Sequence, residues 1–509
     1  MRPTLSTAAL AIGAALLQPA AGQAATALVL QDQAALRAAA RDAAPSQAAL
    51  WRGEAVEIRG ERLDFYQVYD YRRERGGFIR KGQVLPLEGP AAEPAALLAA
   101  LRLVRLQPGA ESLGLGLAAA YVQQASAEQM AGSGGVEALD ALGMLAERLA
   151  ERASRSSAAK LDTPTTSTDT QLAAQLDVAA RYGLKFQSFE REAGSLQLCY
   201  EGEVFRRVLA LPASTPEQQA RAALALTRPE CQNPAATPSQ KLQRELWRAD
   251  ILERVQTTGL APLWRNRLAL RQAAVWGRLA YAQARQSDAN AATQAQAAGA
   301  HALQALARVQ PGELADEDQP LANDAAMQAN AVRWQALPAG APTMSWRRGN
   351  EELQLRLVPG TEGDQCLVLQ STRAREALLR HCSFGLIQTA SFSANREGNA
   401  ATLAVQPTEA WRELWVLRAT PQGWRLDVLP PAPATPGLGY AEFAGWVPGG
   451  QQLLMVREAR AEGRYTPRSF EVLDLQSLQV LRRSGDARQL GPFQRWADAG
   501  WKMASLSLR

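Results

Sequence analysis

Histidine is almost absent from this sequence, and its scarcity excludes most familiar catalytic and metal-binding sites. The chain of 509 residues has 2 histidines, His301 and His381. Metal clusters built on imidazole need several such ligands, and Ser-His-Asp or Cys-His hydrolases need a histidine as their base. His301 lies in an Ala-rich helical segment, and His381 precedes Cys382, for which a disulfide is the favoured interpretation. We therefore expect neither a metal site nor a histidine-based active site.

Excess positive charge is also lacking. The 55 Lys+Arg residues stand against 50 Asp+Glu, a formal net charge of +5. Proteins that neutralise nucleic-acid phosphates carry concentrated basic patches, so no nucleic-acid partner is expected. The basic residues are nearly all Arg, and Ala is abundant, which indicates the base composition of a GC-rich genome.

No segment is apolar for long enough to cross a bilayer, which needs about 20 residues. The apolar stretch from Leu5 to Leu17 is shorter; it follows Arg2 and precedes small residues up to Ala24. This order is typical of a bacterial secretory signal peptide over residues 1–24. The mature chain is expected in the periplasm, with secretion as the alternative and no transmembrane segment.

Cysteines are few. There are 4 of them, Cys199, Cys231, Cys366 and Cys382, and in an oxidising compartment an even number favours disulfides. Three pairings are possible, and proximity in the chain favours Cys199 with Cys231 and Cys366 with Cys382.

Phosphate-binding and nucleophile-elbow motifs are missing as well. The run GLGLAA at 114–119 follows no strand, so it indicates helix packing. The acidic residues Glu313, Asp316, Glu317, Asp318 and Asp324 lack calcium-loop spacing. No cofactor is expected.

Residues 25–89 alternate as short strands between tight turns. They contain GEAVEIRGERLDFYQV at 53–68 and GGFIRKGQV at 76–84. With an opening strand at 27–30 and Leu36-Arg37, this order resembles the bacterial SH3 domain. The resemblance implies a small SH3-like β-barrel. Phe65 stands where that family usually has Trp, which removes an indole N–H donor.

The aromatic residues of this region are candidate ligand-binding residues, because strand alternation must place some of them on the outer face. They are Phe65, Tyr66, Tyr69, Tyr71 and Phe78. Which of them belong to the core is open, and an interface with the following helical part is the alternative to ligand binding.

The middle of the chain has helical periodicity. We expect a helical segment at 90–155, a Thr/Ser-rich flexible linker at 156–170 and a helical domain at 171–338, built of helical hairpins with a short β-hairpin around Glu201-Gly202. Helices are predicted at about 216–227, 239–257, 262–286, 288–309 and 316–336. In the third of these, Arg267, Arg271, Arg278 and Arg285 fall on one stripe. That stripe is either a weak candidate for binding an anionic partner or an ordinary solvated face.

Residues 339–509 change to short strands separated by Gly, Pro or charged turns. The run GWVPGGQQLLMVREA at 445–459 and the later FEVLDLQSLQVLRR at 470–483 resemble a β-propeller blade. The resemblance implies about four blades. A β-sandwich is the alternative for this domain.

The whole sequence therefore predicts a multidomain α+β protein of the bacterial envelope. Our leading hypothesis is a non-enzymatic binding or scaffold protein that recognises peptidoglycan peptides or an envelope protein. The alternative is an envelope hydrolase with paired carboxylates, which needs no histidine. The oligomeric state is open.

Overall fold

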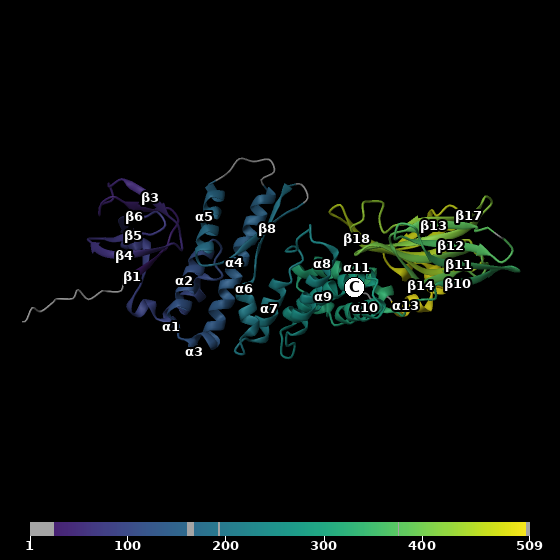
Figure 1. Ribbon diagram of the computed structural model, residues 1–509, viewed down its shortest axis with the longest axis horizontal. Coiled ribbons are helices and arrows are strands. Elements are labelled where there is room, and N and C mark those ends of the chain that lie inside the picture. The colour runs from purple at the N-terminus through teal and green to yellow at the C-terminus, as the bar shows by residue number, and fades with distance from the viewer. Residues whose placement is uncertain (1–24, 160–166, 192–193, 375, 505–509) are drawn as a thin grey trace, which may run out of the picture. The chain divides into compact units, whose positions relative to one another are not determined.

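The computed structural model describes residues 25–159, 167–191, 194–374 and 376–504 (Figure 1). The predicted signal peptide and part of the predicted linker lie outside them. The chain divides into two compact units, Met1–Glu201 (unit 1) and Gly202–Arg509 (unit 2).

Unit 1 begins with an antiparallel sheet of seven described strands in the order β3-β2-β6-β5-β4-β1-β7. The strands are β1 (Ala25–Val29), β2 (Ala34–Arg37), β3 (Ser46–Leu50), β4 (Ala55–Arg62), β5 (Phe65–Asp70), β6 (Arg75–Arg80) and β7 (Val84–Leu87). Each strand contributes to one apolar core: Val29, Leu36, Leu50, Val56, Val68, Ile79 and Val84 are all buried in it. The sheet is therefore curved around a single core.

Helices complete unit 1. They are α1 (Pro94–Val104), α2 (Glu111–Gln124), α3 (Ala127–Ala131), α4 (Ser133–Ala159) and α5 (Ser167–Arg181), followed by the hairpin β8 (Phe186–Glu190) and β9 (Leu196–Tyr200). The GLGLAA run lies within α2, where a Cβ added to Gly114 would come 2.7 Å from the Leu145 side chain of α4. These glycines allow close helix packing, as the sequence indicates.

The β-hairpin prediction around Glu201-Gly202 is wrong in its second strand. Leu196–Tyr200 is a strand, but it pairs with Phe186–Glu190. The second strand was expected at 204–211, but residues 204–210 belong to helix α6 (Glu203–Ala210), in which Val204, Phe205 and Val208 are buried together. Their spacings of one and four residues place these three side chains on one face of a helix. Burial of this face outweighs the strand preference of the β-branched valines.

The helical part of unit 2 closely follows the prediction. After α6 come α7 (Pro216–Leu226), α8 (Pro238–Glu253), α9 (Pro262–Ala284), α10 (Ala291–Ala307), α11 (Gln319–Ala331) and the 3-10 turn η6 (Arg333–Ala336). Thr215 and Thr237 form capping boxes that begin α7 and α8, each with Pro at the first helical position.

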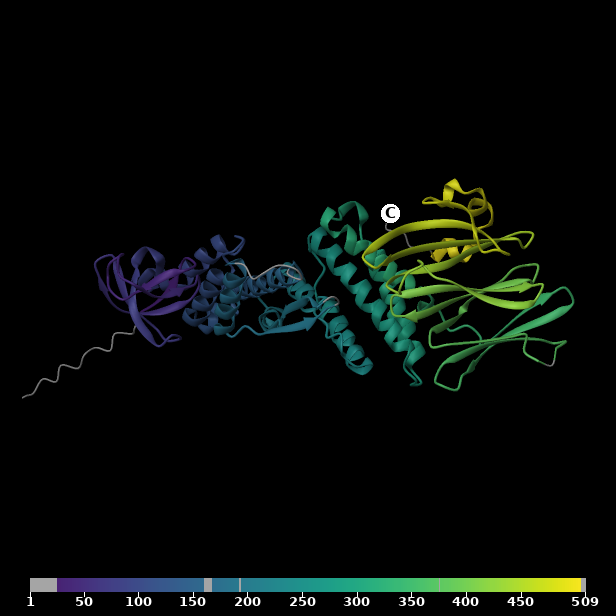
Figure 2. The same ribbon diagram turned by 90° about the horizontal axis from the view of Figure 1, so that it is seen from above.

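The β-rich part of unit 2 consists, over its described residues, of three consecutive four-stranded antiparallel meanders, which Figure 2 shows as successive layers from green to yellow. The first contains β10 (Thr343–Arg348), β11 (Glu351–Pro359), β12 (Gln365–Ser371) and β13 (Leu379–Ser383). The second contains β14 (Leu386–Ala394), β15 (Ala400–Thr408), β16 (Trp411–Thr420) and β17 (Gly423–Leu429). The third contains β18 (Leu438–Val447), β19 (Gln452–Ala461), β20 (Arg464–Asp474) and β21 (Val480–Ser484). A short parallel pairing between β16 and β18 joins the last two into one eight-stranded sheet.

The meanders pack face to face. Leu353 and Leu367 of the first share a core with Leu403 and Trp415 of the second. Leu414 and Val416, on the opposite face of β16, pack with Met455 and other residues of the third meander. The central strands are thus buried on both faces, which explains their continuous apolar runs.

Helices cover the other face of the third meander. Met327 of α11 and Phe493 of α12 (Gly491–Trp496) are buried against Leu454 and Val456 of β19; α13 (Ala499–Ala504) follows. The helical and β-rich parts of unit 2 therefore share a core. The chain as a whole is a mixed α+β protein with an N-terminal sheet region, helical segments and a β-rich end. Each helix in the described ranges is too short or too polar to span a bilayer.

Candidate functional site

The aromatic residues of the N-terminal sheet separate into two groups. Phe65 is buried and Tyr66 packs against the core, although both were candidate ligand-binding residues. Phe78 is half-buried. Tyr69 is half-buried and Tyr71 is 68% exposed, so these two remain available at the surface.

Tyr69, Tyr71 and Arg59 form a continuous surface, which we call the tyrosine surface. The rings of Tyr69 and Tyr71 lie edge to face with their centroids 5.0 Å apart, and the Arg59 guanidinium lies 3.8 Å from the Tyr69 centroid. Arg59 also pairs with Glu57 at 3.3 Å. Hydrogen bonds from Tyr71 and from Arg59 lower the pKa of Glu57. The surface therefore combines flat apolar area with polar groups already held in place.

The predicted arginine stripe lies on α9, and its four guanidinium groups bind other parts of unit 2. Arg267 pairs with Glu317 at 2.7 Å and with Asp318 at 2.8 Å. Arg278 pairs with Glu409 at 3.3 Å, and Arg285 donates to the Phe384 carbonyl at 2.8 Å. The stripe thus connects α9 to its neighbours.

Arg271, the fourth member, binds the C-terminal end of α7. It donates to the Leu224 carbonyl at 3.1 Å, and Arg248 donates to the Thr227 carbonyl. Burial and the neighbouring Arg248 lower the pKa of Arg271 to about 9. Cations at a helix C-terminus bind the carbonyls that lack an intrahelical partner, so this pair has a structural role.

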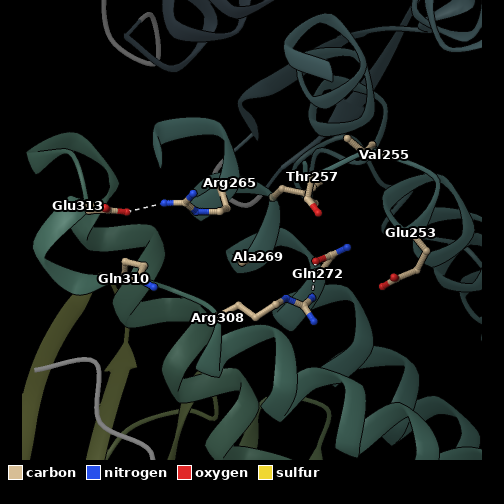
Figure 3. Close-up of a pocket in the computed structure, with 10 residues that line it drawn as sticks. Glu253, Val255, Thr257, Arg265, Ala269, Gln272, Arg308, Gln310 and Glu313 are labelled. Carbon is tan, nitrogen blue, oxygen red and sulfur yellow. Dashed lines mark hydrogen bonds and ion pairs between the residues drawn. The ribbon is translucent and has the colours of Figure 1, made fainter. Parts of the chain in front are cut away.

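A pocket of about 620 Å³ lies between the end of α8, the helix α9 and the segment that follows α10 (Figure 3). Its lining includes Glu253, Val255, Thr257, Arg265, Leu268, Ala269, Gln272, Arg308, Gln310 and Glu313. Arg265 and Glu313 form an ion pair at 2.7 Å on one side. Arg308 donates to the Gln272 side-chain oxygen at 2.7 Å, and Glu253 accepts from the Trp276 indole at 2.9 Å. The volume falls within the range of small-molecule sites.

A shallower hollow of about 470 Å³ lies over the start of α8. Arg206, Ser239, Gln240, Gln243, Arg244 and Trp247 line it. The Arg244 guanidinium lies 4.2 Å from the Trp247 ring centroid, a cation–π contact that accounts for its position.

The disulfide prediction is confirmed for Cys366 and Cys382, which lie opposite each other on β12 and β13. Cys199 and Cys231 are disulfide-bonded as well, and no described cysteine is free. Asp364 comes near Cys366 and Cys382. However, sulfur atoms in a disulfide are not thiolate ligands, so this group does not form a metal site.

Both histidines contact tryptophans. His301 stacks on Trp276 with ring centroids 4.6 Å apart, and His381 meets Trp415 edge to face at 4.8 Å. Neither contact creates a nucleophile–base pair.

Sequence reasoning missed the pocket because its residues are spread from position 253 to position 313 over helices and the segments that connect them. No local motif joins them. Gln272, which holds Arg308, was one polar residue among many on a helix with an apolar face. Only the packing of α8, α9 and α10 brings these side chains together.

In comparisons with known proteins, no family model, no curated protein and no solved structure matches this chain.

Proposed function

We propose that this protein is an exported, non-enzymatic binding protein of the bacterial envelope. Its N-terminal sheet is an SH3-like barrel that recognises peptides, in the first place those of peptidoglycan and otherwise a segment of an envelope protein. The observation that carries the proposal is the tyrosine surface, in which half-buried Tyr69 and exposed Tyr71 lie in contact beside Arg59. The single core to which all seven strands contribute supports the barrel.

Tyrosine suits this role because its ring offers contact area at low entropic cost and its hydroxyl supplies a hydrogen bond. Tyr69 lies on β5 between Val68 and Asp70, which are buried, so its ring lies on the outer face of the strand. Tyr71 follows the last residue of β5, and its ring contacts that of Tyr69 there.

Wall binding is tested by sedimentation of the purified mature protein with isolated peptidoglycan sacculi. The double variant Tyr69→Ala/Tyr71→Ala should leave most of the protein in the supernatant. A matched control is Phe384→Ala, which removes an aromatic side chain that is 60% exposed in unit 2. Sedimentation of the double variant equal to that of the wild type would contradict the proposal, provided that circular dichroism shows both to be folded.

Export is tested separately. N-terminal sequencing of the protein recovered from an expressing bacterium should begin at Ala25, the residue after the predicted cleavage. Recovery of a chain that retains Met1 and the apolar stretch would contradict export by this signal.

The described residues of the β-rich part form three four-stranded meanders and not the four blades expected, and the last two meanders share one sheet. The four-stranded antiparallel form of each meander is what supports a propeller-like architecture. The hydrolase alternative has no specific support in the described pocket. Its two carboxylates, Glu253 and Glu313, are bound by the Trp276 indole and by Arg265.

A further inference from the structure

The pocket of Figure 3 contains two opposite charges that do not neutralise each other. Glu253 and Arg308 point into it from opposite sides. Neither forms an ion pair with another of the residues that the structure describes. The carboxylate and the guanidinium therefore line one pocket without pairing. Each can bind a ligand group of opposite charge.

Neutral side chains hold both charges in position. Gln272 is 5% exposed and is itself fixed, because its amide donates to the Leu252 carbonyl at 3.2 Å while its oxygen accepts from Arg308. The Trp276 indole holds one carboxylate oxygen of Glu253. Since the partners that hold these groups are neutral side chains, both groups keep further hydrogen-bonding capacity toward a ligand of opposite charge.

The charges of the pocket as a whole cancel. The ion pair of Arg265 with Glu313 is neutral, and Glu253 balances Arg308. A ligand with a large net charge of either sign gains little there. A ligand with a separated ammonium and carboxylate matches both free charges at once.

Size and lining narrow the ligand further. About 620 Å³ accommodates a molecule of one to a few residues. Val255, Leu268 and Ala269 form an apolar part of the wall, and Thr257 adds a hydroxyl. These features suit an apolar side chain beside a polar backbone.

We infer that this pocket binds a zwitterionic amino acid or short peptide with an apolar side chain, its carboxylate on Arg308 and its ammonium on Glu253. The inference concerns a second site, in unit 2, and does not depend on the tyrosine surface.

Calorimetric titration of the full mature chain tests the inference. The probes are a panel of free apolar amino acids and dipeptides such as alanyl-leucine, in L and D forms. Each is compared with its N-acetylated and its C-amidated derivative. At least one zwitterionic probe should bind saturably, and either cap should weaken its binding about tenfold or more, since each removes a charge-assisted hydrogen bond.

Two variants that each remove one charge test which end of the ligand binds Arg308 and which binds Glu253. Arg308→Gln should weaken the zwitterion about tenfold or more and leave the C-amidated probe unaffected. Glu253→Gln retains an acceptor for Trp276. It should weaken binding of the zwitterion by the same factor and leave binding of the N-acetylated probe unaffected. Asp250→Asn and Arg254→Gln are the matched controls, because this exposed pair lies at the end of the same helix outside the pocket lining.

Three outcomes would overturn the inference. One is the absence of saturable binding for every probe up to about 10 mM. Another is affinity that is indifferent to both caps. The third is a loss in the Arg308 and Glu253 variants no larger than in the two controls.

Discussion

A side chain at Gly53 of unit 1 would collide with the backbone of another element. The φ of Gly53 is +81°, and a Cβ there would come 2.2 Å from the Ser112 carbonyl oxygen of α2. Its own carbonyl accepts a hydrogen bond from Tyr182 at 2.7 Å. One glycine thus allows the sheet to approach the helices of unit 1.

Gly53→Ala should therefore destabilise unit 1 by at least about 2 kcal/mol, from the left-handed backbone and the displaced α2 together. Urea denaturation followed by far-ultraviolet circular dichroism measures the change. Gly82→Ala is the control, because no atom lies within 4 Å of a Cβ added there. A Gly53 variant as stable as this control would show that α2 shifts without cost.

Glu137 joins two helices of unit 1 through its charge. It accepts from Arg102 at 2.5 Å and pairs with Arg105 at 3.2 Å. The hydrogen bond from Arg102 is the main cause that lowers its pKa below the ordinary value of 4.5. Because the folded state prefers the carboxylate, this stabilisation is present above the ordinary pKa and is lost as pH falls through the lowered one.

Glu137→Gln should then cost about 0.5–1 kcal/mol at pH 7 and nothing once the pH is well below 4.5. Denaturation of both proteins across this pH range gives the difference. Glu128→Gln, on exposed α3, should show no such dependence. A difference that persists in acid would indicate a packing effect instead.

At the scale of elements, the disulfide between β12 and β13 closes a short loop of the first meander, with a sequence separation of 16. Loops of this length restrict the unfolded chain enough to stabilise the fold by about 3 kcal/mol. Cys366→Ala/Cys382→Ala should lower the free energy of unfolding of unit 2 by about 2–3 kcal/mol. The wild type with a reductant should approach the variant, and a variant as stable as the oxidised wild type would contradict this estimate.

Helices and strands could be predicted where the residue composition and the period of the apolar positions indicate the same secondary structure. Helices α7 and α8 have apolar faces of 3.6-residue period and begin with Thr-Pro, so they lie close to their predicted ranges. In the β-rich part, the sequence pattern marks β11, β12, β15, β16, β17, β19, β20 and β21 and misses β10, β13, β14 and β18. The missed strands are polar or rich in Gly and Ala, and β14 and β18 contain bulges that interrupt alternation.

The candidate sites divide in the same way. The tyrosines could be named from the sequence, because aromatic residues on a predicted strand are visible there. Their faces could not be assigned, because a shift of one residue exchanges the two sides. The structure buries Phe65 and exposes Tyr71. The pocket was invisible because helix packing alone assembles it.

At the scale of the whole molecule, two compact units with separate cores should unfold separately. Differential scanning calorimetry should resolve two transitions, and Gly53→Ala should lower only one of them. The disulfide variant should lower the other. A single transition that moves as a whole in both variants would show that the units unfold together.

Unit 2 contains a buried group of charges that spans its helical and β-rich parts. Glu442 of β18 pairs with Arg333 of η6 at 2.7 Å and with Arg412 of β16 at 3.0 Å, and all three are buried. Arg333 precedes both strands in the sequence, so a chain that ends before β18 lacks the carboxylate that pairs with this guanidinium. Burial of a guanidinium without a partner carboxylate has a large desolvation cost, so Arg333 should stay in contact with water until Glu442 is present. We therefore expect η6 to reach its buried position only when β18 is present, and a chain truncated before β18 should expose η6 to proteases.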